Sequence, residues 1–470
     1  MQPNRTCPGP ISRRSFVKLG SIGASSLAFS DLLRMRAEGK TNPAKNDTSV
    51  IFVWLPGGLS HLESYDMKPE APLDYRGDFR PIPTSVPGMD ICELFPQQAR
   101  IANKYNIIRS VAHEFADHGG GHKRFMMAQI PREPAGTIND FPAQPSIISK
   151  LRGRSETGVP NYVVAGNRGN IDTFAFGSAY LGNSTYPFMV DRDPADPKFR
   201  VENLGIDSAM EQRVGNRLEL LKGFDNLHRS VDRSGAMNSM DEFNQRAFDL
   251  MTSERARKAF DLSLEPQHVR ERFGYHNFGQ RGLLALRLVE AGCSFVTLVW
   301  ENPSPPGVPI PNYAVYNWDS HAVNSDLFKE AREWRFAFYD QAVTALIEGL
   351  YERGLDKKTL VVITGEFGRT PRVTNAIGTQ TKVMQPGRDH WPGAMSFIVS
   401  GGGMRTGQII GATNGKGEYP VDRRMTPNDL WVSVYHHLGL NPWQSFPDNS
   451  GRPIPAIPFG EAIPEMAPVS

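Results

Sequence analysis

The stretch Val50-Ile51-Phe52-Val53-Trp54-Leu55, followed at once by Pro56-Gly57-Gly58, decides the fold of this chain. A continuous apolar run of this length is typical of a strand that is covered on both faces, as in a parallel sheet. The proline and glycines after it allow the chain to turn sharply. Similar apolar runs recur along the sequence, at residues 106–111, 162–165, 294–300, 359–364 and 394–399.

Stretches with a helical pattern alternate with these runs. The clearest lies at 326–353, where Trp334, Phe338 and Ala342 fall on one stripe and Gly354 can end the helix. Shorter helices are expected at 93–105, 147–151, 283–291 and 428–438. This alternation predicts an α/β fold with a doubly wound, mainly parallel sheet and helices on both faces.

The domain organisation is predicted from shifts in composition. Residues 50–460 form the α/β domain, and a charged segment at about 208–272, helical in period and without buried-strand runs, forms a helical insertion. A polar linker at 31–49 precedes the domain, and a short tail follows at 461–470.

The N-terminus resembles a bacterial twin-arginine export signal. Arg13 and Arg14 are followed by Phe16 and by the weakly apolar stretch 19–30. That stretch has about 12 residues, whereas a bilayer span needs about 20. Residues 1–30 are therefore predicted to be a signal peptide that directs export to the periplasm or beyond, and no integral membrane span is predicted later in the chain.

Charge and cysteine content exclude several classes of protein. The formal net charge is +2, and four basic residues lie in the first 30, so the body of the chain is nearly neutral and has no footprint for nucleic acid. Three cysteines are too few for a disulfide scaffold. Cys7 lies in the leader, and Cys92 and Cys293 could form one disulfide or remain buried thiols.

Candidate chemistry follows the predicted strands, because ligands in open α/β sheets collect beyond the carboxyl ends of the strands. Six of the eleven histidines lie in such loops, and most have an acid within three residues. Imidazole and carboxylate together suit Zn, Mn or Fe, and a carboxylate-rich site also suits Mg or Ca. The predicted metal ligands are His61, Glu63, Asp66, His118, His122, Asp319, His321, Glu366, Asp389 and His390.

Two features of these loops allow more than one interpretation. His118 and His122 are four residues apart and could share a helix face, but the three glycines between them favour a loop. Arg369 and Arg388 could hold a phosphate or sulfate group with their forked guanidinium groups, or could form salt bridges that orient Glu366 or Asp389. The chain lacks a Gly-x-Ser-x-Gly elbow, a Walker loop and a dinucleotide fingerprint, which disfavours serine-triad hydrolases, kinases and nicotinamide enzymes.

Taken together, these segments resemble the family of exported bacterial proteins called domain of unknown function 1501, which is related to sulfatases and alkaline phosphatases. The resemblance spans nearly the whole chain after the linker. It rests on the leader, Gly57-Gly58-Leu59-Ser60-His61, Asp66-Met67-Lys68-Pro69, Trp318-Asp319-Ser320-His321, Gly365-Glu366-Phe367-Gly368-Arg369-Thr370-Pro371, Gly387-Arg388-Asp389-His390-Trp391 and Gly451-Arg452-Pro453-Ile454-Pro455.

The resemblance implies a sulfatase-like sheet with one or two metals held by Asp and His residues after its strands. By position, Asp319 and His321 resemble one ligand pair, and His390 resembles the last histidine ligand. Glu366 stands where an Asp commonly follows a late strand. Asp66 or Glu63 would represent the acid after the first strand, although active relatives place that acid closer to the strand end.

The nucleophile is where the chain departs from the family pattern. Hydrolases of the wider superfamily present Ser, Thr or a modified Cys at the start of a helix after an early strand, but residues 111–130 contain none of these. Ser60 lies in a comparable turn, which its hydroxyl could equally cap. A metal can lower the pKa of its bound water to about 7, so water could attack directly.

The sequence therefore predicts an exported metal-dependent hydrolase of phosphate or sulfate esters, acting on a small molecule or a glycan. Its cofactor would be a divalent metal, either Zn, Mn, Mg or Ca, and Arg369, Arg388 and Ser60 are the candidate catalytic residues. The alternative is a non-catalytic metal- or ligand-binding protein on the same scaffold.

Overall fold

The computed structural model describes residues 47–167, 173–201 and 236–469, together with Lys45, Gly169, Leu204 and Asn216. The predicted signal peptide, most of the predicted linker and nearly all of the insertion before residue 236 lie outside the described residues. No helix in the described part of the chain is long and apolar enough to cross a membrane.

A single eight-stranded sheet forms the centre of the molecule, in the order β14-β4-β13-β8-β1-β7-β5-β6. Of these strands only β13 runs antiparallel to its neighbours, and the other seven point the same way. The mainly parallel α/β sheet is thus confirmed. The strands are β1 (Ser49–Trp54), β4 (Tyr105–Val111), β5 (Tyr162–Ala165), β6 (Phe188–Val190), β7 (Phe295–Val299), β8 (Thr359–Thr364), β13 (Met395–Gly401) and β14 (Ile409–Ile410).

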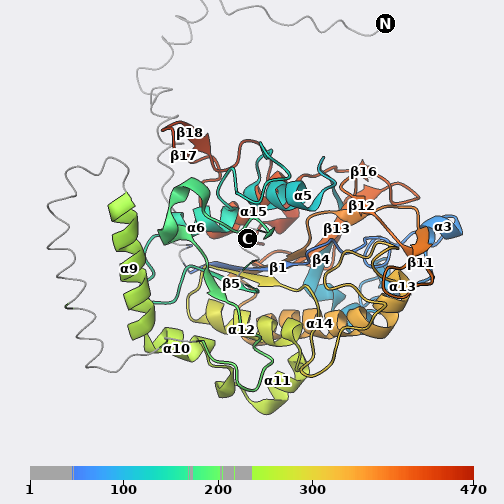
Figure 1. The fold of residues 1–470 in the computed structure, drawn as a ribbon, viewed down its shortest axis with the longest axis horizontal. Helices are drawn as coiled ribbons and strands as arrows, with labels where there is room; N and C mark the ends of the chain where they lie inside the picture. Colours follow the sequence, from blue (N-terminus) through green and yellow to red (C-terminus); the bar gives the residue numbers. More distant parts are fainter. Residues whose placement is uncertain are drawn as a thin grey trace, which may run out of the picture.

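Helices cover both faces of the sheet, because alternate residues of each strand are apolar on each side (Figure 1). Along β1, Ile51 and Val53 belong to one core, and Val50 and Phe52 to the other. The first core is covered by α12 (Asn277–Glu290) and α14 (Phe336–Glu352). The second is covered by α5 (His118–Met127), α6 (Gln144–Arg152) and α15 (Pro427–Leu438).

Two of the predicted helices differ in extent from the helices of the structure. In place of one helix over 93–105, α4 (Pro96–Arg100) is followed by a 3-10 turn (Ala102–Lys104). The helix begins at Pro96, where the carboxylate of Asp340 in α14 accepts from the amides of Gln97 and Gln98, both at 2.9 Å. The long helix at 326–353 consists of α13 (Leu327–Glu330), a π-helical turn (Ala331–Arg335) and α14.

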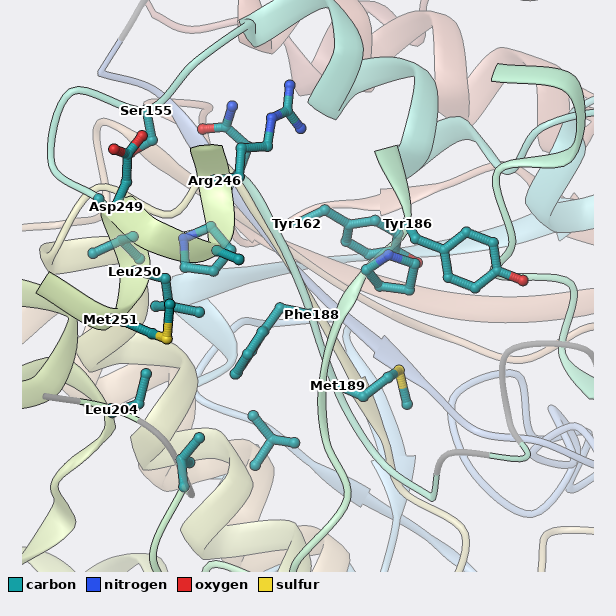
Figure 2. A pocket seen from close by; sticks show the side chains of 18 of the residues that line it. Ser155, Tyr162, Tyr186, Phe188, Met189, Leu204, Arg246, Asp249, Leu250 and Met251 are labelled. Atoms are coloured by element: carbon teal, nitrogen blue, oxygen red, sulfur yellow. The ribbon is translucent and has the colours of Figure 1, made fainter. Parts of the chain in front are cut away.

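The described part of the predicted insertion is helical. It comprises α9 (Ala236–Thr252), α10 (Glu254–Phe260) and α11 (Gln267–Phe273). A cavity of about 890 Å³ lies between α9 and the last two strands of the sheet, β5 and β6, with Tyr162, Phe188 and Leu250 in its wall (Figure 2). The described wall of this cavity includes none of the predicted site residues. At the other end of the chain, Ile463 and Met466 are buried in the second core.

Candidate metal centre

The loops that carry the predicted ligands meet at one edge of the sheet. The loops after β1, β4, β7 and β8 all leave from the carboxyl ends of parallel strands. Gly57, directly after β1, has φ of +102°, and a Cβ there would lie 2.5 Å from the amide nitrogen of Asp319. Only glycine fits this close approach of the first loop to the Asp319 loop.

His390 reaches the same edge because β13 is reversed. It lies in β12 (His390–Trp391), which pairs with β9 (Gly368–Arg369) in the loop after β8. Since β13 runs antiparallel to β8, the residues that precede β13 lie at the edge where β8 ends. The histidine thus precedes its nearest sheet strand, whereas the other candidate ligands follow theirs.

The expectation of a loop between His118 and His122 is wrong, because both residues lie in α5. The Asp117 side chain caps this helix by accepting from the amide of Gly120 at 2.6 Å. A Cβ on Gly121 would lie 3.0 Å from the ring of Phe367, so glycine lets the helix approach the loop after β8. The rings of His118 and His122 stack with their centroids 5.9 Å apart.

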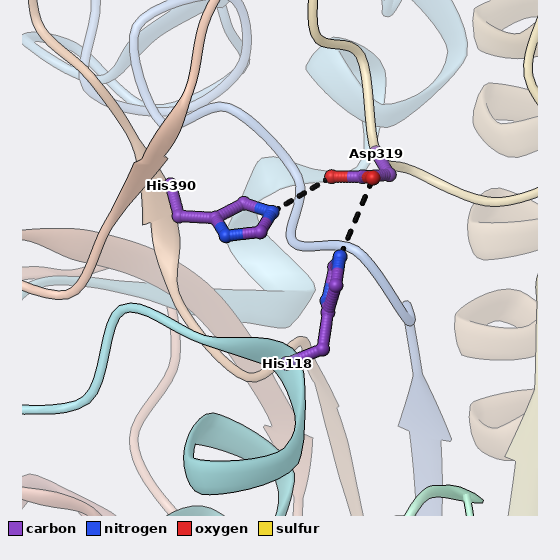
Figure 3. A group of neighbouring side chains, drawn as sticks. All are labelled: His118, Asp319 and His390. Atoms are coloured by element: carbon purple, nitrogen blue, oxygen red, sulfur yellow. Dashed lines mark hydrogen bonds and ion pairs between the residues drawn. The ribbon is translucent and has the colours of Figure 1, made fainter. Parts of the chain in front are cut away.

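A first cluster of candidate ligands surrounds the carboxylate of Asp319 (Figure 3). Its Oδ1 lies 2.9 Å from Nε2 of His390 and 2.9 Å from Nε2 of His321. Its Oδ2 lies 3.3 Å from Nε2 of His118. The two Nε2 atoms of His321 and His390 are themselves 2.9 Å apart. Four side chains from three separate loops therefore converge within one coordination sphere.

The hydrogen bonds on the far sides of two rings define which atoms face inward. Nδ1 of His321 donates to Oδ1 of Asp389 at 2.6 Å, and Nδ1 of His390 donates to the carbonyl of Ala116 at 2.7 Å. In the neutral rings both Nε2 atoms then hold lone pairs, which point toward the Asp319 oxygen. Acceptor atoms packed this closely require a cation between them, either protons or a metal ion. The donor set, two imidazoles and a carboxylate, fits a divalent metal.

A second cluster lies deeper, around Glu366. Its Oε1 lies 2.9 Å from Nδ1 of His118 and accepts from the amide of Gly57 at 2.8 Å. Its Oε2 lies 3.6 Å from Nδ1 of His122, and both of these buried atoms lack a hydrogen-bond partner. Buried polar atoms are normally paired, so this orphaned donor–acceptor set also fits an ion or a water molecule. His118 bridges the two clusters.

The electrostatics of the two clusters differ. Burial by itself would raise the pKa of Asp319, but hydrogen bonds from His118, His321 and His390 outweigh it and hold that pKa well below its usual range. Burial likewise opposes the charged form of His118, yet its contacts with Asp319 and Glu366 raise its pKa to about 9. Burial lowers the pKa of His122 to about 4. The carboxylate of the first cluster is therefore ionised, and the second cluster holds a neutral imidazole at His122.

Arg369 is a positioning residue in this structure. Its guanidinium donates to Oδ1 of Asp319 at 2.7 Å, and to the carbonyl oxygens of Trp318 at 3.0 Å and Arg388 at 3.2 Å. The carbonyl oxygens of Gly57 and Gly58 accept from Nη2 and Nε. The side chain is buried and its five protein acceptors join three loops; three of them share Nη2, whereas Nη1 donates to the Arg388 carbonyl.

Every N–H group of Arg388 has a protein acceptor, and its carboxylate partner differs from that of Arg369. It forms a bidentate pair with Glu63, with Nε at 2.9 Å from Oε2 and Nη2 at 2.6 Å from Oε1. Its other donors reach the carbonyl oxygens of Thr370 and Tyr75, among others. Ser60 donates to Oε2 of the same Glu63. Of the two interpretations of the arginines, the structure favours salt bridges, and it pairs Arg388 with Glu63.

The remaining predicted ligands of the first loop lie outside both clusters. Glu63 is occupied by Arg388, and Asp66 accepts from Lys68 at 2.8 Å and from Thr413. His61 is buried, with Nε2 donating to the carbonyl of Gly417 at 2.8 Å. The structure thus brings together His118, His122, Asp319, His321, Glu366 and His390. Asp389 lies beside this group and is hydrogen-bonded to His321.

Two groups that shape the centre were not among the predicted site residues. His113, one of the six histidines expected after strands, donates from Nε2 to the main-chain carbonyl of Glu366 at 2.6 Å, which fixes the backbone of that ligand. The Ala116 carbonyl anchors His390. A main-chain carbonyl has no sequence signature. Cys92 and Cys293 are both buried free thiols, which decides the question of a disulfide between them.

Comparisons with known proteins place the chain in a family. A model of the family described as "Protein of unknown function (DUF1501)" matches residues 47–466. A search of curated proteins finds no match. A protein of the alkaline phosphatase superfamily from Vibrio parahaemolyticus is 11% identical, with a TM-score of 0.37 over 88% of this chain and 76% of that one.

Two sulfatase structures show similar values. A 2-O GAG sulfatase is 12% identical, with a TM-score of 0.35 over 89% of this chain and 73% of that one. A sulfatase from Pseudoalteromonas sp. is also 12% identical, with a TM-score of 0.32 over 88% and 71%. At this identity and these TM-scores, the similarities assign no activity to the chain.

Proposed function

Because this chain belongs to the DUF1501 family, whose description gives no activity, we propose one from the geometry of its site. The protein is a divalent-metal-dependent hydrolase of phosphate or sulfate esters in which water, rather than a protein side chain, attacks the ester. The observation that carries this proposal is the convergence of the Nε2 atoms of His321 and His390 on the Asp319 carboxylate.

The metal would be held by Asp319 and His390 with His118 as the third ligand. Nε2 of His321 lies 2.9 Å from both Asp319 and His390 and can join them. A divalent cation bound there would polarise an ester oxygen and lower the pKa of a water molecule. The positive charge of such a centre favours an anionic substrate, and the family resemblance favours a phosphate or sulfate ester. Because Arg388 is saturated and Arg369 is buried and bound to Asp319, the substrate anion would depend mainly on the metal for its counter-charge.

The side chains around the centre define the rest of the chemistry. His118 is the most exposed member of the clusters, with 35% of its side chain accessible, and its Nε2 can hold or release a proton beside the metal. The first turn of α5, from His118 to Gly121, contains no hydroxyl or thiol. The ring of Phe367 lies 4.4 Å from that of His390 and covers one side of the site. These features support attack by water in a partly enclosed pocket.

Metal analysis combined with an ester assay tests the proposal. Purified protein should contain stoichiometric divalent metal, and Asp319→Ala and His390→Ala should each lose it. His268→Ala, a change at an exposed histidine of α11, is the matched control and should retain it. Wild type should hydrolyse an aryl phosphate or an aryl sulfate, and both site variants should not. A wild-type protein without bound metal would refute the proposal.

A non-catalytic metal-binding protein is the second candidate, and one observation favours it. Among the described residues, the first turn of α5 offers no hydroxyl or thiol as a nucleophile, and the guanidinium groups of Arg369 and Arg388 are buried and bound to protein carboxylates. Stoichiometric metal that is lost in Asp319→Ala, together with no turnover on a panel of phosphate and sulfate esters, would establish this alternative.

Export is a further part of the proposal. It rests on the paired Arg13 and Arg14 ahead of a short apolar stretch in residues 1–30. Replacing both arginines with lysine keeps the charge but removes the pair. Full-length protein carrying Arg13→Lys and Arg14→Lys should accumulate in the cytoplasm of a twin-arginine-competent bacterium, while wild type appears in the periplasmic fraction. Equal export of both would refute this route.

A further inference from the structure

Asp389 and His321 form a carboxylate–imidazole pair at the rim of the candidate centre. Oδ1 of Asp389 lies 2.6 Å from Nδ1 of His321, and Nε2 of the same ring faces Asp319 at 2.9 Å. The two ring nitrogens of an imidazole point in diverging directions. Asp389 therefore lies on the far side of the ring from the other candidate ligands, and it cannot share with them an ion bound at Nε2.

We propose that Asp389 is a positioning residue of the metal centre: it fixes the tautomer and the orientation of His321 and increases the basicity of its Nε2. This inference rests on the proposed function, because it assumes a metal at that nitrogen. A carboxylate that accepts from one ring N–H leaves the other nitrogen deprotonated and makes it a better donor to a metal.

The surroundings of Asp389 support this role. Its main-chain amide donates to Oγ1 of Thr370 at 2.9 Å, and its carbonyl accepts from the amide of Thr370 at 2.8 Å. The backbone of Asp389 is therefore fixed from both sides. The carboxylate itself is 54% exposed, so it contributes little to the core and its replacement should leave the fold intact.

The neighbouring His390 provides an internal comparison. Its Nδ1 donates to the carbonyl of Ala116, a group of the main chain that no substitution removes. The two rings present equivalent Nε2 atoms to Asp319, but one is oriented by a side chain and the other by the backbone. Changing Asp389 should therefore weaken the contribution of His321 alone and leave a partial ligand set.

The test measures metal affinity directly, with Zn²⁺ and Co²⁺ added to metal-free full-length protein. Asp389→Ala should lower the affinity about 10- to 100-fold, and the visible absorption of the Co²⁺ form should change because His321 is no longer held. Asp389→Asn should fall between Asp389→Ala and wild type, since its amide oxygen can still accept from Nδ1. Glu352→Gln is the control: that carboxylate is 52% exposed and pairs with Arg272 far from the centre in sequence, so affinity should be unchanged.

The outcomes separate this inference from the proposed function. If wild type binds neither ion, the proposed function fails. If wild type binds and Asp389→Ala binds equally well with an unchanged Co²⁺ spectrum, the positioning role is overturned and the metal site stands. If Asp389→Asn is as weak as Asp389→Ala, an accepting oxygen does not suffice and orientation through Nδ1 is refuted. Thermal unfolding of the metal-free variants checks that each is folded.

Discussion

Glu63 and Arg388 form a buried pair with each other in the structure, whereas the sequence predicted Glu63 as a metal ligand and Arg388 as a residue that could bind an anion. This difference gives the sharpest test of the structure. Both side chains are essentially inaccessible, and the pair is bidentate. Glu63→Gln removes the negative charge and keeps the shape. Because Arg388 stays protonated, the substitution leaves an uncompensated buried cation. Losing one partner of such a buried pair costs about 3–5 kcal/mol. The free energy of unfolding, measured by urea titration, should fall by that amount.

The metal content of the same variant decides between the two roles of Glu63. As Glu63 lies outside both clusters, Glu63→Gln should retain the wild-type metal content. Glu352→Gln, which breaks a half-exposed pair with Arg272, should change stability by less than about 1 kcal/mol. A Glu63→Gln protein that lost its metal while keeping wild-type stability would refute the reassignment, and would return Glu63 to the ligands.

Three further outcomes are expected. His276 caps α12 through Nδ1, and burial lowers its pKa to about 4 from an ordinary value of 6.5. Its contribution to stability is therefore complete above pH 6.5 and decreases as the pH falls toward 4. At pH 5 this loss amounts to about 2 kcal/mol. Between pH 7 and pH 5, His276→Asn, which can still cap the helix, should therefore lose about 2 kcal/mol less stability than wild type. Equal losses of stability in wild type and variant, measured by urea titration, would contradict this. Gly57→Ala should abolish metal binding, because its Cβ collides with the Asp319 amide. Stoichiometric metal in a folded Gly57→Ala protein would show that the loop after β1 can accept a side chain at this position. Burial raises the pKa of both Cys92 and Cys293. Neither thiol should therefore react with a thiol reagent until the protein is unfolded. Rapid labelling of the native protein would show instead that one of the two thiols is accessible.

Much of the fold could be predicted from the sequence, since buried strands in a parallel sheet are continuous apolar runs. β1, β7 and β8 are of this kind, and each was predicted to within about a residue at either end. The errors lie where a tertiary contact outweighs local pattern. The helix predicted from residue 93 begins at Pro96 because Asp340, more than 240 residues away, caps it. Likewise, three glycines did not prevent α5 from forming: Asp117 caps the helix, and Gly121 allows it to pack closely against Phe367.

The candidate site was predicted in outline for the same reason: its ligands follow parallel strands whose ends share one edge. What the residues alone could not supply is the direction of each side chain. Asp319 and Glu63 are both acids in loops after strands and both face a guanidinium group, yet only Asp319 also faces three imidazoles. Their roles depend on which loops lie side by side, and that order is a property of the sheet.

The reversed strand β13 shows how strongly the centre depends on that topology. If β13 ran parallel to β8, the residues before it would start from the opposite edge of the sheet, and His390 would lie there too. Since β13 is antiparallel, the chain needs no crossover between β8 and β13, and both ends of the connecting loop stay at the edge where β1 and β7 also finish. That single loop carries Glu366 and His390, together with Arg369 and Asp389, which hydrogen-bond to Asp319 and His321. The candidate metal site is therefore assembled where this connection meets α5 and the Asp319 loop, which supply the other four side chains.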